Sequence, residues 1–73
     1  MTYFEVNGEQ VVQIDVGGKV LSWLWAGDPP LQLGERVILP PTLFREEEFD
    51  GVVVALGSDY DQPGKLRHVS RRA

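Results

Sequence analysis

The chain alternates short runs of apolar and polar residues with turns that contain glycine or proline. Residues 9–16 place mostly valine and isoleucine at every second position, and this period of two predicts a strand with one buried face. Asn7-Gly8 precedes this segment and Gly17-Gly18 follows it, and both pairs suit hairpin turns whose central residues take positive φ. The pattern therefore predicts an N-terminal β-meander of three strands over residues 3–6, 9–16 and 19–25.

The second half of the chain predicts two or three further strands. Arg36–Leu39 is an apolar segment that ends at Pro40, because proline lacks the N–H that a ladder needs. Gly51–Leu56 has no polar residue on either face, which predicts the most buried strand. Residues 42–50 are expected to hold a helical turn or to form a loop. Residues 65–71 predict a last strand, with a short helix as the alternative because two apolar residues there are three positions apart.

These elements together predict an all-β fold. A small antiparallel sheet has exposed edges that invite pairing with other chains, and closure into a barrel removes them. We therefore expect a small SH3-like or OB-like barrel of five to six antiparallel strands, forming one domain over residues 1–73. A chain of this length buries only about 60% of its unfolded surface, so the 42% hydrophobic fraction must be used well.

The charges are divided unevenly along the chain. The net charge is -4, but residues 1–64 hold three basic residues against all eleven acidic ones, a net charge of -8, whereas residues 65–73 carry +4. A local basic segment can contact a nucleic-acid backbone or the acidic face of a protein even when the rest of the chain is acidic. The alternative is that the tail is a solvated terminus whose charges only favour solubility.

Several chemical functions conflict with the residue types present. The chain has no cysteine and therefore no disulfide, thiolate nucleophile or thiolate metal site. One histidine, His68, cannot supply the three or four ligands of a usual zinc site. The consecutive carboxylates Glu46, Glu47 and Glu48 do not converge on a cation without a loop that aims them. We expect no metal and no cofactor.

Catalytic arrangements are equally weak in this sequence. His68 and Ser70 would share one face of a strand, but no nucleophile elbow accompanies them. Asp59 and Asp61 flank Tyr60 in a turn-rich segment, where aspartate is favoured because its side chain bonds its own backbone. Gly17-Gly18 lacks the spacing and the lysine of a phosphate-binding loop. The chain is therefore expected not to be an enzyme.

The surroundings of the protein are predicted from two absences. No segment approaches the roughly 18 apolar residues of a membrane-spanning helix, and the N-terminal residues lack the basic and apolar pattern of a secretory signal. We expect a cytoplasmic protein without a membrane partner.

A binding surface remains, and two kinds of partner stay open. Exposed aromatic side chains stack on bases or anchor protein partners, although the tryptophans of so small a domain also suit its core. The candidates for binding nucleic acid are Trp23, Lys65, Arg67, Arg71 and Arg72. The candidates for binding protein are Trp25, Phe44, Glu46, Glu47, Glu48 and Tyr60. The protein is expected to be a monomer or a weak homodimer that pairs through an edge strand.

Four segments also carry a family resemblance. They are Val20-Leu-Ser-Trp-Leu-Trp25, Gly34-Glu-Arg-Val-Ile-Leu-Pro40, Asp50-Gly-Val-Val-Val54 and Lys65-Leu-Arg-His-Val69. In this order they resemble the N-terminal DNA-binding domain of the primosomal replication-restart helicases. The resemblance implies a small β-barrel that captures the 3′ end of a nascent strand at a stalled fork.

The chain departs from that family's pattern at three places. Leu21-Ser22-Trp23 stands where the family has an aromatic-Asp-Tyr triplet, Pro41-Thr42 replaces Phe-Gly, and Arg67 occupies the place of a lysine. The resemblance therefore implies stacking by Trp23 and phosphate contact by Arg67, without the acidic residue that would touch the terminal sugar.

Overall fold

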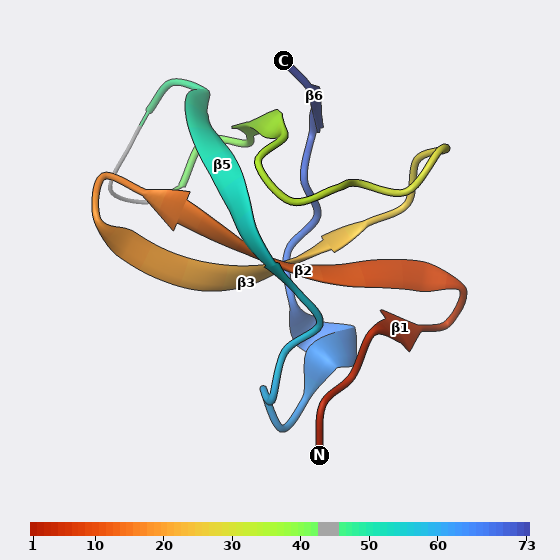
Figure 1. Cartoon of the computed structure of the whole chain (residues 1–73). Helices are drawn as coiled ribbons and strands as arrows, with labels where there is room; N and C mark the ends of the chain where they lie inside the picture. Colours follow the sequence, from red (N-terminus) through yellow and green to blue (C-terminus); the bar gives the residue numbers. More distant parts are fainter. Residues whose placement is uncertain (43–45) are drawn as a thin grey trace.

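The computed structural model describes residues 1–42 and 46–73, and the described chain is all-β (Figure 1). Its strands form one sheet in the order β1-β2-β5-β4-β6, with β3 also paired to β2 and all neighbouring strands antiparallel. The predicted all-β fold with an N-terminal meander is confirmed. The strands are β1 (Glu5–Val6), β2 (Glu9–Val16), β3 (Lys19–Trp25), β4 (Arg36–Leu39), β5 (Phe49–Leu56) and β6 (Arg71–Arg72).

Turn chemistry explains the N-terminal meander. Asn7 and Gly8 have φ angles of 52° and 79°, and Gly17 and Gly18 have 59° and 92°. Both pairs therefore form turns with positive φ at their central residues, as the sequence predicts. The Asp15 carboxylate adds a hydrogen bond from the Gly18 N–H at 2.9 Å. As a result, β2 and β3 stay paired along the whole of the hairpin.

The core lies on one face of the sheet, where alternate residues of its strands meet. The register between β2 and β5 shifts between Gln13 and Ile14, and Gly51 lies directly against Ile14. A Cβ atom at position 51 would lie 2.5 Å from the Ile14 Cγ2, so glycine allows β5 to pass close to β2. The buried residues of the core cluster are Val12, Ile14, Trp23, Trp25, Leu31, Val37, Leu39, Val53 and Val69.

The fold differs from the expected barrel in its closure, because the sheet is an open path of strands. Near Leu24 the gap between β3 and the C-terminal segment is bridged. The Leu24 N–H donates to the Arg67 carbonyl oxygen, and the Leu24 carbonyl oxygen accepts from the Val69 N–H, both at 2.8 Å. Between Leu24 and the Gly17-Gly18 turn, no described strand other than β2 pairs with β3. The sheet is therefore not closed into a barrel and has an open seam along this part of β3.

The C-terminal segment is neither the continuous strand over 65–71 nor the helix that the sequence suggests. Pro63–Lys65 form a 3₁₀ turn, η1, and only Arg71–Arg72 form a strand. Proline suits the first position of a helical turn because its φ is fixed and its missing N–H has no partner there anyway. The segment therefore meets the sheet only at single points before β6 begins.

Strand β5 also departs from the prediction. It begins at Phe49 instead of Gly51, and it is not the most buried strand, since Val54 and Leu56 are exposed by 45% and 40% while no residue of β2 is exposed. Among the described residues, no second layer covers the outer face of β5 at these two side chains. The predicted connector 42–50 falls partly on residues 43–45, which lie outside the described residues. Within the described residues no helix has the length and hydropathy to span a membrane.

Candidate binding groove

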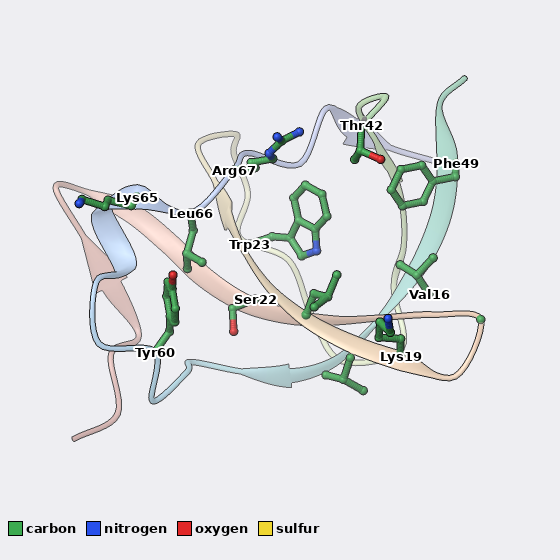
Figure 2. Close-up of a pocket in the computed structure, with 13 residues that line it drawn as sticks. Val16, Lys19, Ser22, Trp23, Thr42, Phe49, Tyr60, Lys65, Leu66 and Arg67 are labelled. Atoms are coloured by element: carbon green, nitrogen blue, oxygen red, sulfur yellow. The ribbon is translucent and has the colours of Figure 1, made fainter. Parts of the chain in front are cut away.

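A groove of about 850 Å³ opens along the seam beside β3 (Figure 2). The end of the β2–β3 hairpin forms one wall, and the segment from Tyr60 to Arg67 forms the other rim. The groove thus occupies the place where the sheet fails to close. Its described lining residues are Val16, Gly17, Lys19, Val20, Leu21, Ser22, Trp23, Thr42, Phe49, Tyr60, Lys65, Leu66 and Arg67.

Trp23 forms the floor of the groove. Strand alternation puts Leu21 and Trp23 on one face of β3, opposite the fully buried Ile14 and Val12 of β2. Trp23 is only 4% exposed, whereas Leu21, nearer the hairpin turn, is 48% exposed. The buried indole Nε1–H of Trp23 has no hydrogen-bond partner within residues 1–42 and 46–73. The floor is therefore apolar and contains one unused donor.

The described cations that have no described carboxylate partner gather at this groove. The described residues include six lysines and arginines, of which Arg36, Arg71 and Arg72 form ion pairs with carboxylates. The other three, Lys19, Lys65 and Arg67, all line the groove, and no carboxylate is among its described lining residues. In a chain with a net charge of -4, the groove is therefore a locally positive surface.

Arg71, a predicted nucleic-acid contact, is not among the groove's lining residues and is held by Glu48. Its two terminal nitrogens donate to both carboxylate oxygens of Glu48 at 2.7 and 3.0 Å. This pairing lowers the pKa of Glu48 below its usual 4.5 and raises the pKa of Arg71. Glu46, Glu47 and Glu48 are exposed and line a second, smaller depression beside Phe49. The acidic run is thus not part of the groove lining, but it adjoins the groove at Phe49, which lines both depressions.

Arg72 and Trp25, predicted for two different partners, contact each other. The Arg72 guanidinium lies 5.1 Å from the centre of the Trp25 ring and donates to Glu35 and to the Pro29 carbonyl oxygen. The Trp25 Nε1–H donates to the same carbonyl oxygen at 3.1 Å. The pKa of Glu35 is lowered first by the backbone N–H of Gln32 and further by Arg72. Trp25 is 8% exposed, so this cluster stabilises the fold and offers little surface to a partner.

Tyr60 lies at the rim of the groove and is 48% exposed. Its backbone N–H donates to the Ser58 hydroxyl at 3.2 Å, and that hydroxyl lies 2.6 Å from the hydroxyl of Ser22 on β3. The rim is therefore connected to the strand that it faces. Phe44, another predicted protein contact, lies outside the described residues.

The groove thus brings together residues from both predicted sets. Trp23, Lys65 and Arg67 were expected at nucleic acid and Tyr60 at protein, and all four line one surface. Lys19 was not among the residues predicted to bind a partner, although the period of two places it on the same face as Leu21 and Trp23.

Other chemistry is sparse in the described part of the chain. Its histidine and acidic side chains form no group of three that could hold a metal ion. His68 Nε2 lies 2.7 Å from a carboxylate oxygen of Glu9 on β2, away from Ser70. Comparisons with protein-family models, with curated proteins and with solved structures found no match.

Proposed function

We propose that this protein is a non-enzymatic binding module that holds an extended, negatively charged segment in the groove along β3. The observation that carries the proposal is the position of Lys19, Lys65 and Arg67, which are the described cations without a carboxylate partner and which all line one groove free of described carboxylates. Elsewhere the acidic residues outnumber the basic ones, so an anionic ligand is attracted to this surface and repelled by the others.

A segment of a partner protein suits this groove best. The groove has an apolar floor at Trp23 and apolar walls that include Leu21 and Leu66, which favour a ligand with both apolar and acidic side chains. Fewer of the residues expected to bind nucleic acid are available for it, because Arg71 and Arg72 are held in ion pairs and the ring of Trp23 is almost fully buried.

The test is a titration of the tryptophan fluorescence with an acidic peptide that also contains apolar residues. Each exposed ion pair contributes up to about 1 kcal/mol, or about fivefold in Kd. The double variant Lys65→Ala/Arg67→Ala should therefore weaken binding by about 5- to 30-fold. Arg36→Ala is the matched control, because Arg36 is exposed, lies on β4 and is not among the residues that line the groove. Equal Kd values for all three proteins would refute the proposal.

A second candidate ligand is single-stranded nucleic acid, and the observation in its favour is the half-exposed Tyr60 on the same rim of the groove as Lys65 and Arg67. A base can stack on this ring while its phosphates meet the cations. The resemblance to the restart-helicase domain agrees with this candidate. Three phosphate contacts predict that log K falls with log salt with a slope of about -2, so a fourfold rise in salt lowers affinity about 20-fold. A titration with an oligothymidylate that has a free 3′ end, at two salt concentrations, decides this case.

A further inference from the structure

The outer edge of β3 has backbone groups that are not used by the described chain. The N–H and C=O of Leu24 point away from β2, because they bond to Arg67 and Val69. Alternate residues of a strand direct these groups to the same edge, so those of Val20 and Ser22 also point outward. Within the described residues, neither backbone N–H nor backbone C=O of these two residues has a partner. Two donors and two acceptors are therefore free along the groove.

An edge with unpaired groups in an extended strand is a template for another strand. The place that such a strand would occupy is the open seam, where the groove already provides the necessary space. One face of the added strand would pack toward Leu21 and the floor at Trp23, and the other would face outward with Val20. The seam is thus the unfilled strand position of an otherwise nearly closed sheet.

We propose that the open edge of β3 binds an extended acidic segment of a partner protein as an added β-strand. The inference rests on the proposed function and names its partner and its binding mode. Hydrogen bonds to Val20 and Ser22 hold the backbone of the segment, and Lys19, Lys65 and Arg67 pair with its carboxylates. Apolar side chains at alternate positions cover Leu21 and Trp23.

Charge and backbone chemistry favour this occupant over two others. A nucleic-acid strand has no regular series of backbone donors and acceptors to match those of β3. A second copy of the chain paired through the same edge would bring the cations of both grooves together, and like charges in close contact are unfavourable. An acidic peptide strand satisfies both the free backbone groups and the cations.

The experiment uses the full chain and a peptide of alternating valine and glutamate, long enough to span Lys19 to Trp23. The comparison peptide has the same sequence, with N-methyl groups on the amides that would face β3. These methyl groups leave the charges and the side chains of the peptide unchanged. We expect the methylated peptide to bind at least tenfold more weakly, since it loses the ladder with Val20 and Ser22. Amide hydrogen exchange at Val20 and Ser22 should slow when the unmethylated peptide binds.

A variant of the protein tests the same contact from the other side. Val20→Pro removes one outward N–H without removing a hydrogen bond between β3 and β2, and Val20→Thr keeps that N–H as the control. We expect the proline variant to bind the peptide at least fivefold more weakly than the threonine variant. If the proline variant does not fold, the methylated peptide and the exchange measurement still decide.

The outcomes separate the two proposals. Binding that depends on Lys65 and Arg67 but ignores N-methylation, without slower exchange at Val20 and Ser22, would overturn strand addition and leave the proposed function standing. Binding of oligothymidylate but not of the peptide would also overturn strand addition. Protection of these two amides that depends on protein concentration alone would identify a second copy as the occupant. Failure of both probes to bind would reject the proposed function as well.

Discussion

Replacing Gly51 with alanine tests the close contact between β2 and β5. The new Cβ would lie 2.5 Å from the Ile14 Cγ2, 3.1 Å from the Asp15 carbonyl oxygen and 3.2 Å from the Val16 Cγ2. Ile14 is fully buried, so it can give way only by disturbing the core or by separating the two strands. Overpacking of this kind costs about 2 kcal/mol. For a domain of this size, that loss lowers Tm by about 8–16 °C.

Urea unfolding followed by tryptophan fluorescence measures the loss, and two further variants isolate its cause. Gly64→Ala is the control, because a Cβ at position 64 meets nothing within 4 Å, and we expect almost no change in its free energy of unfolding. Ile14→Leu removes the branch at Cβ with little change in volume, so Gly51→Ala should cost at least about 1 kcal/mol less in that background. An equal cost of Gly51→Ala in both backgrounds would refute the contact as the cause.

Three further changes are expected to affect stability. The pKa values of Glu35 and Glu48 are lowered from 4.5, so their stabilisation is complete above about pH 4.5 and is lost as the pH falls through the lowered values, which urea unfolding at several pH values can follow. Trp25→Phe should destabilise more than Trp23→Phe in thermal unfolding, because only Trp25 loses an indole hydrogen bond, worth about 1 kcal/mol. Asn7→Ala should cost about 1 kcal/mol and Asn7→Gly almost nothing, since the φ of 52° disfavours a β-carbon; equal costs would contradict the role assigned to this turn.

The parts of the fold that follow from local sequence could be predicted. Asn7-Gly8 and Gly17-Gly18 determine turns by their own backbone preferences, and the apolar alternation between them determines which face of β2 is buried. These signals act over a few residues and need no knowledge of the rest of the chain. The burial of β5 is different, because it depends on whether a second layer covers its outer face, and Val54 itself carries no information about that layer.

Closure of the sheet could not be predicted for the same reason. It depends on where the C-terminal segment meets β3, and that contact joins Leu24 to residues more than forty positions later, Arg67 and Val69. Segment 65–71 was expected to form a whole strand, whereas the proline of η1 and the two-residue length of β6 leave the seam open. The groove is therefore a product of an incomplete strand that the sequence pattern could not resolve.

The basic tail predicted part of the candidate site, because two of its four basic residues line the groove. Lys65 and Arg67 line the groove and have no carboxylate partner within residues 1–42 and 46–73, but Arg71 pairs with Glu48, 23 positions away, and Arg72 with Glu35, 37 positions away. A run of like charges in sequence does not stay together in space when the chain supplies distant carboxylates for some of its members. Sequence proximity predicted one basic patch of four residues, and folding divided it in two.

Because the basic residues are divided in this way, the net charge of the whole chain differs from the charge at the groove. The net charge of -4 would repel an anionic ligand if all charges acted equally at the groove. At physiological salt, however, interactions between exposed charges are screened beyond about 8 Å, while the molecule extends over 31 × 24 × 21 Å. No described carboxylate lines the groove, so screening weakens the repulsion between the carboxylates and a bound ligand more than the attraction of the lining cations, although the carboxylates slow its approach at low salt. Close contact is governed by Lys19, Lys65 and Arg67, so the local charge of the seam, and not that of the whole chain, determines which ligand it accepts.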